Sequence, residues 1–325
     1  MSTPRAFITG ISGFAGSYLA EELLAGGYDI GGSVYPNEST ANLSAIIDRV
    51  SLVTLDILDA NNCAAAVAAF KPDYIFHLAA ASSVGQSFEK ERLTYQTNID
   101  GTLNVLAAAI TLPNLRKVIY VGSAECYGIF RPKSKTLTEE QPFNPISPYG
   151  IAKAAAEQAS LYYCRKHGLP VSVARSFNHS GPRQAEHFVI PSFARQVAQI
   201  EAGLLPPVLS VGDLSVKRDL SDVRDIVRGY RLMAEKGRVG RVYHLCSGRA
   251  VSIQSVVNVM LKMSSKKIRV RVDPSRRRQI DIPILRGDNS RAVQELGYKA
   301  RYRLQTTIMD TLDYWRDQIR QTPRP

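Results

Sequence analysis

A tyrosine and a lysine four residues apart, Tyr149 and Lys153, form the pair in this sequence best suited to proton transfer. If the segment is helical, residues at this spacing share a face, so the phenol and the ammonium lie together. A phenol has a pKa of about 10 and is a poor acid or base at neutral pH, but a nearby ammonium stabilises the phenolate and lowers that pKa. The pair could then serve the interconversion of a carbonyl and an alcohol. Because this spacing often occurs by chance, it needs support from its surroundings.

Ser123 provides that support, because it comes just after a predicted strand that ends at Val121. In a doubly wound sheet the carboxyl ends of the strands line the ligand crevice. We therefore expect Ser123 to hydrogen-bond the same substrate oxygen as Tyr149.

A glycine-rich segment near the N-terminus, from Gly10 to Gly16, has the spacing GxxGxxG. Such a turn lets backbone N–H groups approach a pyrophosphate, and the following helix directs the positive end of its dipole at that charge. The segment follows a predicted strand and opens a predicted helix, which is the context that gives the motif meaning. We expect a dinucleotide to contact Gly10, Ser12, Gly13, Phe14 and Gly16.

The acidic residue that binds a ribose 2′-hydroxyl in NAD enzymes is missing directly after the second predicted strand. That segment reads Ser33 to Asn37, and the nearest acid, Glu38, lies further into the loop. The sequence therefore favours NADP(H) over NAD(H), although no arginine stands there to bind a 2′-phosphate. Asp56 and Ile57, after the third strand, could receive the adenine ring, while a turn or helix cap is an equal alternative for Asp56.

Strand-like and helix-like segments alternate through the first half of the chain. Strands are expected at residues 6–9, 28–34, 51–55, 74–78, 117–121 and 170–175, with later strands at 241–246 and 267–272. Helices are expected at 17–24, 64–70, 92–109, from 148 onward, and at 192–202, 252–263 and 304–319. This rhythm predicts an α/β fold with a doubly wound parallel sheet (Rossmann) and a smaller α/β C-terminal substrate lobe. Residues 1–175 and 219–248 would form the dinucleotide-binding domain, and 176–218 and 249–325 the lobe.

Composition excludes several classes of protein. With 45% hydrophobic and 22% charged residues, the 325-residue chain has the makeup of a globular protein and not of a disordered one. No signal peptide and no apolar run of about 18 residues is apparent, so we expect a cytoplasmic protein. The spacing of the four cysteines suits no zinc site, and we predict no metal. The net charge of +12 is concentrated at 266–278, but the sequence lacks the signatures of nucleic-acid binders.

Four ordered motifs resemble the extended short-chain dehydrogenase/reductase family over nearly the whole chain: TGISGFAG, HLAA at 77–80, GSAECYG at 122–128 and SPYGIAK at 147–153. The resemblance implies a catalytic set of Ser123, Tyr149 and Lys153 and a nicotinamide cofactor. It also implies that the cofactor contacts Leu78, Ala79, Ala80, Asn98, Tyr149 and Lys153.

Further segments resemble the nucleotide-sugar branch of that family. RSFNHSGPRQ at 175–184 is similar to its substrate loop, with Asn178 directed toward the sugar or the phosphate. Arg218, Arg278 and Asp281 resemble residues that grip the diphosphate and the ribose, a task that suits the planar arginine fork. The substrate residues that the resemblance implies are Ser83, Ser123, Glu125, Asn178, Val189, Arg195, Arg218, Arg278 and Asp281.

Within this branch the chain is most similar to the reductases of GDP-4-keto-6-deoxy-D-mannose, which form GDP-D-rhamnose, and to their sister GDP-mannose 4,6-dehydratases. In the dehydratases of this branch an acid at the position of Glu125 removes the C5 proton, so Glu125 is compatible with a dehydratase; an acid at this position is also compatible with the reductases that the chain resembles. The arginine-free segment 35–42 argues against a dehydratase. Another nucleotide-sugar reductase or epimerase, or a non-catalytic dinucleotide-binding regulator, remains an alternative. Helices near 92–109 and 148–166 resemble those of a dimer interface in relatives, so a homodimer is expected.

Overall fold

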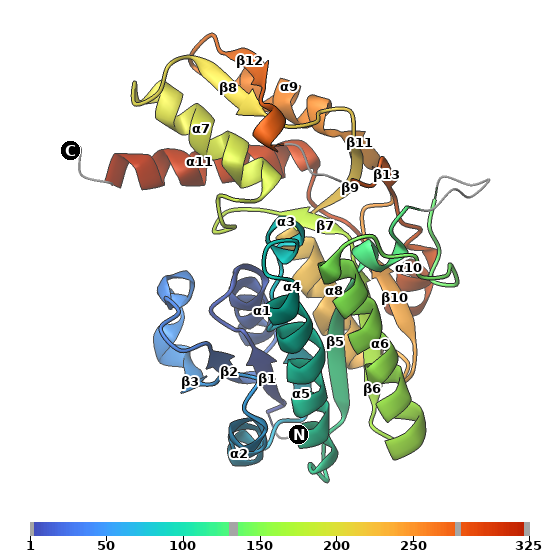
Figure 1. Cartoon of the computed structure of the whole chain (residues 1–325). Coiled ribbons are helices and arrows are strands. Elements are labelled where there is room, and N and C mark those ends of the chain that lie inside the picture. The colour runs from blue at the N-terminus through green and yellow to red at the C-terminus, as the bar shows by residue number, and fades with distance from the viewer. Residues whose placement is uncertain (1–2, 130–135, 277–280, 322–325) are drawn as a thin grey trace.

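The computed structural model describes residues 3–129, 136–276 and 281–321 and is built around one seven-stranded sheet (Figure 1). All its strands are parallel, in the order β3-β2-β1-β4-β5-β6-β10. They are β1 (Arg5–Thr9), β2 (Asp29–Val34), β3 (Val50–Thr54), β4 (Tyr74–His77), β5 (Lys117–Ser123), β6 (Val171–Ser176) and β10 (Val242–Leu245). The doubly wound fold is thereby confirmed. The strand order reverses between β1 and β4, where such sheets open a ligand crevice.

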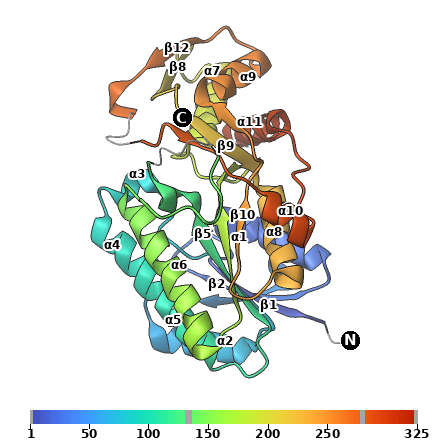
Figure 2. The same ribbon diagram turned by 90° about the vertical axis from the view of Figure 1, so that its right-hand side faces the viewer.

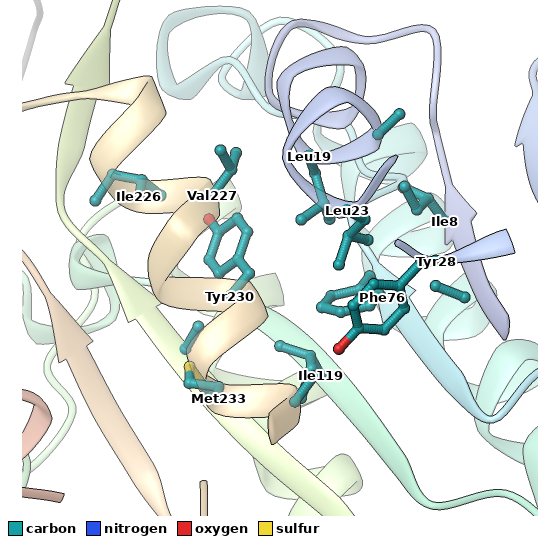
Figure 3. Packing of buried hydrophobic residues seen from close by; sticks show 14 of the residues in the cluster. Ile8, Leu19, Leu23, Tyr28, Phe76, Ile119, Ile226, Val227, Tyr230 and Met233 are labelled. Carbon is teal, nitrogen blue, oxygen red and sulfur yellow. The ribbon is translucent and has the colours of Figure 1, made fainter. Parts of the chain in front are cut away.

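Helices cover both faces of the sheet. One face carries α1 (Phe14–Ala25), α8 (Val223–Lys236) and α10 (Ser290–Leu296), and the other carries α2 (Ala60–Phe70), α5 (Gly101–Ile110) and α6 (Pro148–His167). Tyr230 and Met233 of α8 belong to the same apolar cluster as Leu23 of α1 and Phe76 and Ile119 of the sheet, and Figure 3 shows these side chains between the two helices and the strands. Each of these five side chains is buried, so the helices are fixed against the strands by apolar packing.

The long helix expected at 92–109 is interrupted by a π-helical turn. It consists of α4 (Glu91–Tyr95), the turn η3 (Gln96–Asp100) and α5. The turn carries the buried Asn98, whose side chain accepts from Ala81 N at 2.8 Å and donates to Ala81 O at 3.1 Å. Such turns often occur at functional sites. In this protein the turn, through Asn98, fixes the segment that connects β4 to the short helix α3 (Val84–Ser87).

A second group of elements lies above the carboxyl ends of the sheet in both views (Figures 1 and 2). The helices α7 (Val189–Glu201), α9 (Ile253–Met263) and α11 (Leu304–Gln321) share an apolar core with β8 (Val208–Val211), which pairs with β12 (Arg269–Val272). Between this group and the main sheet, β9 (Lys217–Asp222) pairs with β7 (Asn178–Ser180), β11 (Ala250–Ser252) and β13 (Ile284–Leu285). Within the described residues the chain also forms the single turns η1 (Ala41–Leu43), η2 (Ile47–Arg49), η4 (Ala124–Tyr127) and η5 (Pro274–Arg276).

Not all segments expected to form the C-terminal lobe pack into the core of that lobe. Besides the helix expected at 192–202, residues 176–218 contain β7 and β8, which are too short to show a strand periodicity. Ala292 and Leu296 of α10 pack into the apolar cluster of α1 and α8 and not into the core of α7, α9 and α11. The division into two domains remains a prediction. Among the described residues, no helix combines the length and apolarity needed to cross a bilayer.

Candidate active site

One large cavity, of about 1490 Å³, is lined by both groups of elements. The main sheet contributes the glycine-rich turn and the segments that follow β2, β3, β4, β5 and β6. The second group contributes α7, and β9 lines the cavity between the two. Most of the predicted site residues line it: Gly10, Gly13, Phe14, Gly16, Asp56, Ile57, Leu78, Ala79, Ala80, Ser83, Ser123, Glu125, Tyr149, Lys153, Asn178, Val189, Arg218 and Asp281. The fold therefore brings together residues that are up to 271 positions apart in the chain.

The glycine-rich turn is too tight for side chains at two of its positions. Gly10 has a φ of +69°, and a Cβ there would lie 3.1 Å from Ala79 Cα. At Gly16 a Cβ would lie 2.2 Å from Gly10 O, closer than any real contact. Gly13 caps α1 without a side-chain hydrogen bond, so the N–H groups of the first turn are not occupied by a cap. These features fit a dinucleotide whose pyrophosphate rests against the backbone and the helix dipole.

The segment after β4 is fastened to this turn by Thr9. Its hydroxyl oxygen accepts from the N–H groups of Leu78 at 3.1 Å and Ala79 at 3.0 Å and bonds the His77 ring at 2.8 Å. Burial lowers the pKa of His77 to about 3, so this ring is neutral and acts as a packed polar link to Thr102. Leu78 and Ala79 are thereby held where they line the cavity.

Tyr149 and Lys153 both lie in the first two turns of α6. The helix begins at this point because Ser147 accepts from Gly150 N at 3.1 Å and Pro148 occupies the first position. The Tyr149 hydroxyl is hydrogen-bonded to Ser123, at the end of β5, and Lys153 Nζ donates to Val121 O at 2.8 Å. The structure thus joins the serine, the tyrosine and the lysine at one end of the cavity.

Burial is the largest influence on the pKa of both Tyr149 and Lys153. It raises the pKa of Tyr149 to about 12, an effect that the hydrogen bond from Ser123 partly opposes, and it lowers the pKa of Lys153 to about 8. The direction for Tyr149 is opposite to the one predicted, because desolvation outweighs the stabilisation of a phenolate. Tyr149 is therefore protonated at neutral pH and is suited to donate a proton.

Glu125 lies beside Ser123, in η4. Its backbone N–H donates to Ser123 Oγ at 3.2 Å, and only 7% of the residue is exposed. Under this turn, Arg175 of β6 binds both carboxylate oxygens of Glu157 in α6 at 2.6–3.0 Å and donates to Tyr127 Oη at 2.5 Å. This buried network connects the strand, the helix and the turn that carry the candidate catalytic side chains.

The opposite wall of the cavity is polar. The Oδ1 atom of Asn178 is buried and has no hydrogen-bond partner among the described residues, so it is a candidate ligand contact. Arg218 forms an ion pair with Asp281 and donates to Ile282 O at 2.6 Å. Arg278 lies outside the described residues, whereas its neighbour Arg276 lines the cavity.

Three predicted contact residues in the described part of the chain do not line the cavity. Ser12 is buried and donates to Glu38 at 3.1 Å, and Asn98 holds Ala81 as described above. Arg195 pairs with Glu186 at 2.8 Å, and its guanidinium lies 6.0 Å from the centroid of the Trp315 ring in α11. Direct ligand contacts by these three residues remain predictions. Ser12 and Asn98 contribute to the cavity only indirectly, by binding Glu38 and Ala81.

Several lining residues were not placed in the site by sequence reasoning. They include Tyr35, Glu38, His179, His187, Phe193 and Arg276. His179 followed Asn178 in a predicted loop, and its ring stacks on Phe14 of the glycine-rich turn with centroids 6.0 Å apart. His179 belongs to the segment 175–184 that resembles the substrate loop, but its place against Phe14 depends on how β7 lies relative to the start of α1, which the sequence does not reveal.

Comparison with known families gives one match over most of the chain. The profile of the family described as GDP-mannose 4,6 dehydratase matches residues 7–311. The GDP-6-deoxy-D-mannose reductase of Pseudomonas aeruginosa is 31% identical over 98% of this chain and 99% of its own. GDP-mannose 4,6 dehydratase 2 of Arabidopsis thaliana is also 31% identical, over 95% of this chain and 86% of its own.

Solved structures agree with these relatives in fold. RMD from Pseudomonas aeruginosa complexed with NADPH superposes with a TM-score of 0.84 and 30% identity, covering 97% of this chain and 100% of that one. DesIV, a dTDP-glucose 4,6-dehydratase from Streptomyces venezuelae with NAD bound, has a TM-score of 0.84 and 27% identity, covering 96% and 97%. Proteins of this shape thus hold either nicotinamide dinucleotide.

Proposed function

Because the chain belongs to the GDP-mannose 4,6-dehydratase family, and so is a nucleotide-sugar oxidoreductase of the short-chain type, we propose that it reduces GDP-4-keto-6-deoxy-D-mannose to GDP-D-rhamnose. The observation that carries the proposal is the meeting of Ser123, Tyr149 and Lys153 in the cavity that the glycine-rich turn also lines. The near full-length match to the Pseudomonas reductase supports reduction as the reaction.

The chain's own residues would act on one oxygen atom, the C4 carbonyl of the sugar. A bound reduced nicotinamide supplies the hydride for C4. Ser123 donates a hydrogen bond that orients the carbonyl, and Tyr149 transfers its phenolic proton to the oxygen as the C=O bond becomes C–OH. Lys153, charged below its pKa of about 8, stabilises the phenolate left behind. Water then reprotonates Tyr149.

The diphosphate end of the substrate would meet the polar wall. Arg218 and Arg276 supply positive charge there, and Asp281 together with the Ile282 carbonyl holds the Arg218 guanidinium in place at the cavity wall. Asn178 offers a buried acceptor for a hydroxyl of the sugar. We propose Arg218, Arg276, Asp281 and Asn178, with Ser83 and Val189, as substrate contacts.

A 4,6-dehydratase is the second candidate, and Glu125 is the observation that favours it. This acid lies two residues from Ser123, is nearly buried and lines the cavity, as a base for the C5 proton would. The two candidates differ in their use of cofactor. A reductase consumes reduced nicotinamide in each turnover, whereas a dehydratase returns the hydride to the same sugar.

Three finer points also remain proposals. NADP(H) was expected from the sequence, and the NADPH complex of the Pseudomonas neighbour supports it, but the position of Glu38, treated below, opposes it. A homodimer is supported by exposed apolar side chains on α4 and α6, among them Leu93 at 49% and Tyr162 at 45%. Location in the cytoplasm is proposed from the sequence alone.

The test is a pair of incubations with purified protein. GDP-4-keto-6-deoxy-D-mannose plus NADH or NADPH should give GDP-D-rhamnose, identified by chromatography, with equimolar loss of absorbance from the reduced cofactor. GDP-mannose alone should be recovered unchanged. Conversion of GDP-mannose to the keto sugar without net cofactor consumption would replace the reductase by the dehydratase.

A further inference from the structure

Glu38 lies against the glycine-rich turn, at a place that neither the sequence patterns nor the relatives assign a role. Its Oε2 atom accepts a hydrogen bond from Ser12 Oγ at 3.1 Å. Ser12 belongs to the turn itself, and Glu38 lines the same cavity as Gly10, Gly13 and Ser33. The carboxylate therefore faces the region where the turn would hold a dinucleotide.

The loop that carries Glu38 is folded back onto the turn by more than this one bond. Asn42 Nδ2 donates to Ser12 O at 3.0 Å, and Asn42 O in turn accepts from Arg183 at 3.0 Å. Glu38 N donates to Tyr35 O at 3.0 Å, which closes a turn around Asn37. Asn37 has a φ of 64°, a left-handed conformation that asparagine tolerates better than most residues. The position of the Glu38 carboxylate is thus fixed by the fold of its loop and does not depend on one flexible side chain.

This position matches the place of an adenosine ribose. In dinucleotide folds the pyrophosphate rests on the turn, and an acid about 20 residues further on binds the ribose 2′-hydroxyl. Glu38 follows Gly16 by 22 residues and reaches the turn although it lies beyond the end of β2. A carboxylate there accepts a hydrogen bond from a hydroxyl group but repels a 2′-phosphate, which carries a charge near −2.

No cation balances that repulsion in the described part of this region. The neighbouring lining residues at the ends of β2 and β3 are Ser33, Tyr35, Asp56 and Ile57, which add a second carboxylate and no lysine or arginine. Arg183, which contacts Asn42, is engaged by both oxygens of Glu21 at 2.7 and 3.1 Å and does not line the cavity.

We infer that Glu38 is the residue that determines cofactor specificity in this protein and that it selects NAD(H) over NADP(H). The inference rests on the dinucleotide site of the proposed function but not on its sugar substrate. It reverses the preference expected from the sequence, where Glu38 stood too far into the loop to be placed.

The experiment measures dinucleotide binding without any sugar, so that its outcome is separate from that of the proposed reaction. NADH and NADPH are titrated into the purified protein, and affinity is read from the change in nicotinamide fluorescence. The natural protein should bind NADH about tenfold tighter than NADPH or more, equivalent to about 1.4 kcal/mol. Glu38→Gln should bring the two affinities within about threefold, and Glu38→Arg should reverse the preference.

The matched control is Glu89→Gln, which removes an acid that lines the same cavity beside α3. It should leave the ratio of affinities unchanged, and retained NADH binding by Glu38→Gln shows that this variant is folded. Equal or tighter binding of NADPH by the natural protein, or an unchanged ratio in Glu38→Gln, would overturn the inference. A protein that binds neither dinucleotide would overturn the cofactor site itself.

Discussion

Tyr149 is the side chain that must give up a proton in the proposed reduction, and its surroundings keep that proton in place until then. Burial raises its pKa to about 12 and Ser123 orients its hydroxyl. Tyr149→Phe should therefore lower kcat by about 10²–10⁴-fold, because the phenolic proton is the only group removed. NADH binding should stay within about twofold of the natural protein. The control is Tyr162→Phe on the exposed face of the same helix, which should leave kcat unaltered.

Lys153 sets the pH dependence of the same step. Burial lowers its pKa to about 8, so it is charged below that pH and neutral above it. If the charge supports proton transfer from Tyr149, kcat/KM for reduction should be level between pH 6 and about 7.5 and fall as the pH rises through about 8. A rate that climbs between about pH 7 and 9 would contradict this role. In Lys153→Met the descending limb should disappear together with most of the activity.

A substitution of Glu125 distinguishes the two candidate reactions. In a reductase, Glu125→Gln should change kcat less than about tenfold, because the amide preserves shape and the carboxylate takes no proton. In a dehydratase the same change should abolish conversion of GDP-mannose. Both substrates are assayed on the same protein preparation, and a complete loss of keto-sugar reduction would assign Glu125 a part in that reaction as well.

At the scale of elements, the buried ion pair Arg175–Glu157 joins β6 to α6. Side chains of both residues are at most 6% exposed, and removing one partner leaves the other charge buried and unpaired. Glu157→Gln should lower the free energy of unfolding by about 3 kcal/mol, measured by urea denaturation. The matched control is Asp317→Asn, which removes the partner of Arg320 on the exposed end of α11 and should cost less than about 1 kcal/mol. Equal losses of unfolding free energy in the two variants would show that the buried pair stabilises the fold no more than the exposed pair does.

The elements differ in how well the sequence predicts them. β5 and α6 are among the longer elements, and α6 begins at the capping residue Ser147, so their positions, and with them the proximity of Ser123 to Tyr149, could be predicted from the sequence pattern. β7 and β13 have three and two residues and owe their existence to pairing with β9, which no local pattern reveals. Glu38 was visible in the sequence, but its contact with Ser12 depends on a loop fold that tertiary contacts decide.

At the scale of the whole molecule, α4 and α6 present an apolar surface that the rest of the described chain leaves uncovered. Leu93, Ile151 and Tyr162 are 43–49% exposed on these two helices. If a second copy covers them, as proposed, light scattering should give twice the mass of the chain, and Tyr162→Arg should shift it to that of a monomer. Met309→Arg changes an equally exposed apolar residue on α11 and should leave the mass unchanged. A monomeric natural protein would remove the proposed interface.

The most direct measurement of the central claim follows the hydride itself. Purified protein is incubated with GDP-4-keto-6-deoxy-D-mannose and a nicotinamide cofactor that carries deuterium at both C4 positions, and the product is examined by mass spectrometry and NMR. The account predicts GDP-D-rhamnose with one deuterium, located at C4 of the sugar, for each cofactor oxidised. Unlabelled sugar, label at any other carbon, or oxidation of the cofactor without a C4 alcohol would contradict it.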